Sequence, residues 1–176
     1  WGKYMCNIRY LNLMDDLYLV EQEVKKTKVS MEPEPINHIW IYDRSYSMTH
    51  ELPQLAQDLI YRAKQLPHKD TLTLGWFASE GQHDYILKGF KVTDQSDHKA
   101  LENIINNNKR PVGCTCFSEI LTSTKSVISN LAALNKNFAL CFFTDGYPVV
   151  GNYQREIETI QKAIKAIEGK ISSSLM

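Results

Sequence analysis

Little in this sequence points to a membrane protein or to a small domain held together by disulfides. The chain has four cysteines in 176 residues, and no charged-then-apolar leader opens it. Its longest apolar stretch near the middle, around residues 139–143, is far shorter than the ~20 residues of a membrane-spanning helix. We therefore expect a globular domain with no membrane span in this segment.

An excess of charge of either sign is also missing. The 20 Lys and Arg residues balance 20 Asp and Glu residues, which gives a formal net charge of +0. A neutral chain has no general attraction for phosphate backbones or anionic membranes, so we expect no nucleic-acid partner. The 43% apolar and 23% charged residues are typical of a globular protein, and the length is sufficient for one domain with a buried core.

The cysteines lack the spacing of a disulfide framework or of a zinc finger. Cys114 and Cys116 are close together, but no second Cys or His pair follows at finger spacing. Reduced thiols are the simpler interpretation, and they favour an intracellular, cytoplasmic location. A cleaved leader upstream of Trp1 would instead permit an extracellular location.

From residue 36 onward the apolar pattern alternates between strands and helices. Only six residues join the strands expected at 71–77 and 84–92, which is too short for a parallel crossover and predicts an antiparallel hairpin. The stretch FALCFFT at 138–144 has no polar alternation and predicts a strand buried on both faces. The remaining elements are a strand at 39–42 and helices near 52–63, 97–106, 117–131 and 157–167.

This order predicts an α/β fold, a Rossmann-like three-layer sandwich. Its central sheet is mostly parallel with one antiparallel edge strand, and helices cover both faces. Residues 1–35 read as a flanking segment and linker, and residues 36–176 as the domain. The last residues, KISSSLM from Lys170, predict the start of another strand, so we expect the domain to be cut short at its C-terminus.

Polar side chains follow the ends of several expected strands. Asp43, Ser45 and Ser47 come directly after the first strand, Thr115 lies in a loop before a helix, and Asp145 follows the strand at 138–144. Ligands of open α/β sheets bind outside the carboxyl ends of the strands. Two carboxylates and three hydroxyls are hard oxygen donors, which suit Mg²⁺ or Mn²⁺.

The alternate spacing of the first three residues supports this interpretation. In an extended segment, residues two apart point the same way, so Asp43, Ser45 and Ser47 can converge on one point. The simpler alternatives are a helix N-cap for these residues and a turn role for Asp145 before Gly146. Neither alternative accounts for all the polar residues at this sheet edge together.

The motif DRSYS, the loop with Thr115 and the motif FFTDG together resemble the metal-ion-dependent adhesion site of von Willebrand factor type A domains. The resemblance covers residues 36–176. It implies that Ser45, Ser47 and Thr115 bind the ion through their hydroxyls, with Asp43 and Asp145 binding it directly or through water. It also implies a partner protein that presents an Asp or Glu to the metal.

Two positions depart from the family pattern. Arg44 and Tyr46 stand where small residues are frequent, so they add bulk, and Arg44 adds positive charge. Together with Tyr147 they are expected at the rim, where Tyr and Arg are common partner contacts. The Arg44 guanidinium can alternatively take the electrostatic place of the metal, which would make the site degenerate.

Three functions are therefore open. The first is a metal-dependent protein-interaction module that belongs to a larger protein or assembly and contacts its other domains or subunits. The second is a structural scaffold of a multi-subunit complex with a degenerate site. The third, a metal-dependent phosphate hydrolase, is disfavoured because Ser45 stands where that chemistry needs a second carboxylate, and no Walker-type loop occurs. We therefore do not expect this domain to be an enzyme.

Overall fold

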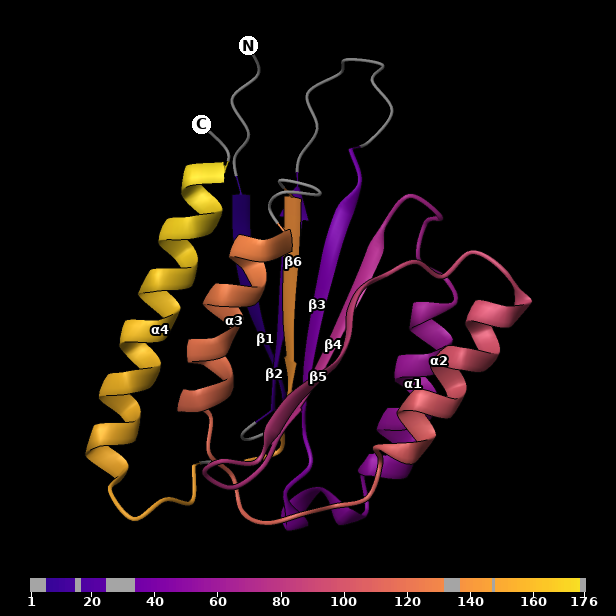
Figure 1. The fold of residues 1–176 in the computed structure, drawn as a ribbon. Helices are drawn as coiled ribbons and strands as arrows, with labels where there is room; N and C mark the ends of the chain where they lie inside the picture. The colour runs from indigo at the N-terminus through magenta and orange to yellow at the C-terminus, as the bar shows by residue number, and fades with distance from the viewer. Residues whose placement is uncertain (1–5, 15–16, 25–33, 132–136, 147, 175–176) are drawn as a thin grey trace.

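The computed structural model describes residues 6–14, 17–24, 34–131, 137–146 and 148–174 (Figure 1). Strands and helices alternate from residue 36 onward, as the sequence predicts. The elements are β1 (Cys6–Met14), β2 (Leu17–Val24), β3 (Ile36–Asp43), the 3₁₀ helix η1 (Tyr46–Thr49), α1 (Leu52–Ala63), β4 (Thr71–Phe77), β5 (His83–Phe90), α2 (Gln95–Asn107), α3 (Ser118–Leu131), β6 (Asn137–Phe143) and α4 (Tyr153–Ser174).

The central sheet has the strand order β5-β4-β3-β6. Strand β3 pairs in parallel with both β4 and β6, whereas β5 pairs antiparallel with β4. Helices α1 and α2 cover one face, and α3 and α4 cover the other (Figure 1). The predicted three-layer α/β sandwich with one antiparallel edge strand is thus confirmed. Strands β1 and β2 form a separate antiparallel hairpin.

Strand β3 is hydrophobic on both faces because a helix layer covers each of them. Trp40 and Tyr42 pack into the cluster on the α1 and α2 side, while Ile39 and Ile41 pack into the cluster on the α3 and α4 side. Burying each such side chain stabilises the fold by about 1.5–3 kcal/mol. This packing fixes where β3 ends, and therefore where Asp43 lies.

Two expectations are wrong in detail. Strand β6 is at an edge of the four-stranded sheet, and of its residues only Phe138 is fully buried. Its other apolar side chains are half-buried and pack on both faces, Leu140 and Phe142 against one core cluster and Cys141 and Phe143 against the other, so the strand is covered on both faces but less completely than predicted. A continuous apolar run does not distinguish a central strand from an edge strand that packs beneath helices. The strand expected from Lys170 is instead the end of α4, because the four-residue spacing from Ile167 to Ile171 continues the helical repeat.

In the described part of the chain, no helix combines the length and the hydropathy needed to cross a bilayer.

Gly75 in β4 leaves room for the ring of Tyr85 in the neighbouring strand. A Cβ added at Gly75 would lie 3.0 Å from two ring carbons of Tyr85 and 3.3 Å from the Asp84 carbonyl oxygen. The ring cannot easily retreat, since its hydroxyl bonds Thr124 Oγ1 at 2.5 Å. Burial raises the pKa of Tyr85 to about 12.

We predict that Gly75→Ala destabilises the fold by about 1–3 kcal/mol, because the added methyl group overpacks the β4–β5 contact. The measurement is urea unfolding at pH 7. Gly151→Ala is the matched control, since a Cβ there has no atom within 4 Å, and it should change the free energy of unfolding by less than ~0.5 kcal/mol. Equal stabilities of the two variants would contradict the predicted contact.

Candidate functional site

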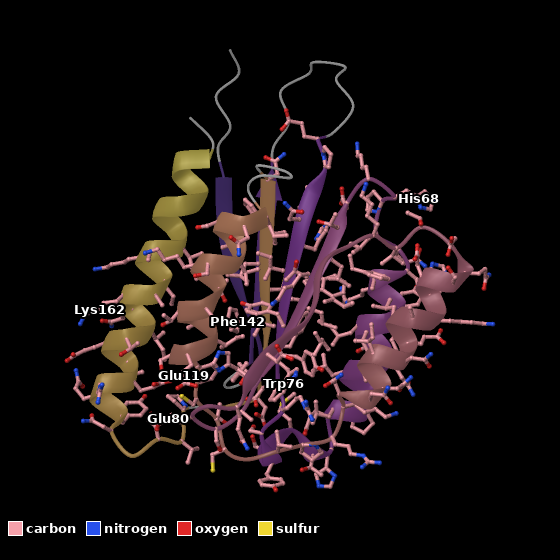
Figure 2. All side chains as sticks on the ribbon, in the orientation of Figure 1. His68, Trp76, Glu80, Glu119, Phe142 and Lys162 are labelled. Atoms are coloured by element: carbon pink, nitrogen blue, oxygen red, sulfur yellow. The ribbon has the colours of Figure 1, made fainter. Side chains whose placement is uncertain are left out.

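The carboxyl ends of β3, β4 and β6 meet at one edge of the sheet, where backbone hydrogen bonds join the loops. Arg44 N donates to Phe77 O at 2.8 Å, and Tyr46 N donates to Gly113 O at 3.0 Å. Figure 2 shows Trp76 close to this edge and His68 near the opposite end of the sheet. These bonds join the loop after β3 to the end of β4 and to the loop before α3.

Asp43 is the last residue of β3 and is fully buried. Its Oδ1 accepts a hydrogen bond from Ser45 N at 2.7 Å, and its Oδ2 accepts one from Thr144 Oγ1 at 2.8 Å. Burial raises the pKa of Asp43, the bonds from Ser45 and Thr144 oppose this shift, and the negative charge of Asp145 adds to it. The protein thus keeps a carboxyl group where its charged form is disfavoured, which a nearby cation would relieve.

The two serines link this region to Asp145. Ser45 Oγ and Ser47 Oγ lie 2.8 Å apart, and Ser47 Oγ donates to Asp145 Oδ1 at 3.0 Å across 98 residues of sequence. Ser45 is buried, whereas Ser47 is exposed and Asp145 is half-buried. The hydroxyl and carboxylate oxygens therefore run from the interior of the sheet edge out to the solvent.

The local backbone differs from the extended loop that the sequence predicts. Ser45 is extended, with φ −63° and ψ 163°, but Ser47 lies inside the 3₁₀ helix η1. The tight turn, and not alternation along a strand, brings the two hydroxyls together. The helix-cap alternative is also not observed, because neither Ser45 before η1 nor Glu51 before α1 makes a side-chain cap bond.

Thr115 reaches the same edge of the sheet through its backbone. Its carbonyl oxygen accepts a hydrogen bond from Val149 N at 2.8 Å, and the residue is buried. Gly113 permits this path, since its φ is +61° and an added Cβ would lie 2.3 Å from Ser79 Oγ. The loop before α3 therefore lies beside the segment that follows Asp145.

The donor set fits a small hard cation. In octahedral coordination with Mg–O distances near 2.1 Å, neighbouring oxygens lie about 3.0 Å apart. The separations from Ser45 Oγ to Ser47 Oγ and from Ser47 Oγ to Asp145 Oδ1, 2.8 and 3.0 Å, have this size. Within the described residues, no three or more His, Cys, Asp or Glu side chains converge as a metal site, so a cation here would need the hydroxyls.

Arg44 is not at the rim, where we expected it. The residue is 7% exposed, and its guanidinium stacks 4.2 Å from the centroid of the Trp76 ring. Its Nε and Nη2 donate to Arg110 O at 3.0 and 2.8 Å, and its Nη1 donates to Asn108 Oδ1 at 3.4 Å. The side chain thus turns toward the loop after α2, because the aromatic face and the carbonyl offer it partners there.

Tyr46 and Tyr147 are the other two residues expected at the rim. Tyr46 is 66% exposed beside the serines. Tyr147 lies outside the described residues. Val149, which the sequence did not single out, is 64% exposed, and its N–H bonds the Thr115 carbonyl.

Sequence reasoning missed two further residues of this region. Thr144 donates to Asp43, and its position directly before Asp145 in FFTDG was the one available signal. Glu156, in the first turn of α4, accepts hydrogen bonds from the backbone of Phe117 and Ser118. Nothing in the spacing of Glu156 along the sequence pointed to the loop before α3.

No protein-family profile matches this chain, and no curated protein matches it by sequence. Among solved structures it is similar to the pilus adhesin SpaC from Lactobacillus rhamnosus GG in its open conformation, with a TM-score of 0.53 and 19% identity. That match covers 82% of this chain and 19% of the adhesin chain.

The chain is also similar to a von Willebrand factor type A structure from Catenulispora acidiphila, with a TM-score of 0.57 and 12% identity. This match covers 76% of this chain and 30% of that one. A more distant similarity is to proximal thread matrix protein 1 from the mussel byssus with a zinc-occupied MIDAS motif, at a TM-score of 0.43 and 12% identity, covering 78% and 45% of the two chains. The similarity to the Catenulispora acidiphila structure shows that the chain has a von Willebrand factor type A-like fold.

The raised pKa of Asp43 predicts a pH dependence of the metal-free protein. The folded state binds the proton of the Asp43 carboxyl group more tightly than the unfolded state does. Protonated Asp43 therefore stabilises the fold fully at pH values below its pKa in the unfolded chain, and this stabilisation is lost as the pH rises through its pKa in the folded state. We predict that Asp43→Asn, measured by urea unfolding in chelator at pH 7, is more stable than the wild type by more than ~0.5 kcal/mol. The difference should shrink as the pH is lowered toward 4. A less stable Asn variant would contradict the burial cost assigned to Asp43.

Proposed function

We propose that this domain is a protein-interaction module that binds a divalent metal, Mg²⁺ or Mn²⁺, at the carboxyl edge of its sheet. The observation that carries the proposal is the linked set of Ser45 Oγ, Ser47 Oγ and Asp145 Oδ1, with separations of 2.8 and 3.0 Å. Asp43 lies beneath this set, and Thr115 is in the adjoining loop. These five residues are the proposed ligands, Asp43 and Asp145 directly or through water.

A bound divalent cation would supply positive charge and a free coordination position at the surface. Asp43 and Asp145 formally balance the two charges of the cation, but when they bind through water they leave it without a directly bound anion, and the three hydroxyls add none. An Asp or Glu of a partner protein is therefore the chemistry that best completes the site. Exposed Ser47 marks where this carboxylate approaches.

Binding is favoured over phosphate hydrolysis by the state of Asp43. A nucleophilic carboxylate must reach its substrate, but Asp43 is 0% exposed, and its two oxygens bond Ser45 N and Thr144 Oγ1. Ser45 also stands where a second carboxylate would act as acid and base. These features suit a group that holds a cation from below.

A scaffold with a degenerate site is the alternative. That alternative relied on Arg44 as a substitute for the metal charge, and the guanidinium instead bonds Arg110 O and Asn108 Oδ1. The metal-binding proposal is therefore the stronger of the two.

We predict that the purified domain binds Mg²⁺ in a calorimetric titration with one site, and that Asp43→Ala and Asp145→Ala each abolish the heat. Each variant removes a carboxylate from the set, while the circular dichroism spectrum should remain that of the wild type. Glu102→Gln, on α2, is the control and should bind as the wild type does. Absence of Mg²⁺ and Mn²⁺ binding by the wild type would favour the scaffold.

We also predict that exposed Tyr46 contacts the partner. The probe is a library of displayed random 12-residue peptides selected in Mg²⁺, in which we expect enrichment of Asp or Glu that disappears in chelator. Tyr46→Ala should weaken the selected peptides about tenfold, as loss of a central aromatic contact does. Tyr61→Ala on α1 is the matched control, since Tyr61 is 68% exposed and Tyr46 66%. Equal losses in the two variants would argue against a contact at Tyr46.

A further inference from the structure

We propose that Arg44 and Glu156 are positioning residues that hold the segment 108–118, and with it Thr115, in the conformation that the metal site requires. This inference rests on the proposed function. It assigns a role to two buried charged side chains outside the proposed ligand set, which is Asp43, Ser45, Ser47, Thr115 and Asp145.

Arg44 fixes the first part of this segment. Two of its guanidinium nitrogens donate to the Arg110 carbonyl, and a third donates to Asn108 Oδ1. Its own carbonyl accepts a hydrogen bond from Val112 N at 2.6 Å. The planar guanidinium can hold one carbonyl with two donors while it stacks on Trp76, which a lysine cannot do.

Glu156 fixes the last part of the segment from a different helix. Its Oε1 accepts hydrogen bonds from Phe117 N and Ser118 N, both at 2.8 Å, and from Cys116 Sγ at 3.6 Å. Ser118 is the first residue of α3, so a carboxylate from α4 satisfies free N–H groups at the positive end of the α3 dipole. This arrangement fixes the backbone within three residues of Thr115.

Arg44 and Glu156 are both charged residues and both are buried. Arg44 is 7% exposed and Glu156 is 6% exposed, and burying an ionised group is costly unless it is well bonded. Both side chains bond backbone groups of the same segment, Arg44 before Gly113 and Glu156 after Thr115. A loop whose conformation did not matter would not require a buried cation at one end and a buried carboxylate at the other.

The role also explains why a large residue is tolerated next to Asp43. Arg44 follows a proposed ligand directly, yet its backbone N–H bonds Phe77 O and its side chain lies on the Trp76 side of the sheet edge. The strand register thus sends Asp43 and Arg44 to different partners. One residue belongs to the proposed metal site, and its neighbour supports the loop that completes it.

The test is the Mg²⁺ affinity of four variants in the purified domain, measured by calorimetry, together with the free energy of unfolding in chelator. Arg44→Met keeps the apolar stem on Trp76 but removes the donors, and Glu156→Ala removes the acceptor. We expect each to weaken Mg²⁺ binding about tenfold or more, the loss typical of residues that orient metal ligands. Arg44→Lys and Glu156→Gln should weaken it less, since they retain a donor or an acceptor and are expected to fold even if the other two do not.

The controls are Lys64→Met and Glu102→Gln, which remove an ion pair between the end of α1 and α2 without touching the segment. They should leave the Mg²⁺ affinity unchanged. A merely structural role predicts lower unfolding free energies with wild-type Mg²⁺ affinity in all four variants, and that result would overturn the inference while leaving the proposed function intact. Absence of Mg²⁺ binding by the wild type would overturn both.

Discussion

The candidate site depends on one constraint, a carboxyl group that is fully buried at the end of a strand covered on both faces. Ile39, Ile41, Trp40 and Tyr42 place the end of β3 inside the molecule, and Asp43 is fixed there with them. Burial disfavours the charged form of Asp43, and its two hydrogen bonds compensate only in part, so that its pKa is raised. The site is therefore a place where the fold gives up stability, as is common at functional sites.

The surrounding loops supply groups that partly offset the burial of Asp43. Thr144 donates to the buried carboxylate, the two serines continue outward to Asp145, and backbone bonds attach the Thr115 loop to both neighbouring segments. Arg44 and Glu156 support this layer from opposite sides of the sheet edge. The hydroxyl groups have no net charge, so a divalent cation bound directly by them, with the two aspartates reached through water, would favour a partner's carboxylate as a direct ligand.

Much of the fold could be predicted from local patterns. The limits of β4 and the β4–β5 hairpin follow from the Thr- and aromatic-rich run at 71–77 and the short link after it. The position of β6 at a sheet edge could not be predicted, because an apolar run is compatible with either place. The end of α4 differs from the prediction because the short run after Gly169 is compatible with a strand as well as with the helical spacing that continues through it.

The sequence likewise predicts one part of the candidate site and not another. The placement of Asp43, Ser45, Ser47 and Asp145 at one edge of the sheet could be predicted, because they lie at or just after the ends of β3 and β6, two strands that the apolar pattern indicates. The 3₁₀ turn at Ser47, the inward course of Arg44 and the contact of Glu156 with α3 depend on tertiary packing between segments distant in sequence. No regular spacing in the sequence indicates such contacts. The size and charge of Arg44 therefore suggested a residue at the rim, although its side chain turns inward.

The most direct test of the central claim is anomalous diffraction from crystals of this domain soaked in Mn²⁺. We expect one strong anomalous peak within roughly 2.5 Å of Ser45 Oγ and Ser47 Oγ, with Thr115, Asp43 and Asp145 around it. Well-ordered loops without a peak at this edge, or with the only peak elsewhere on the molecule, would contradict it.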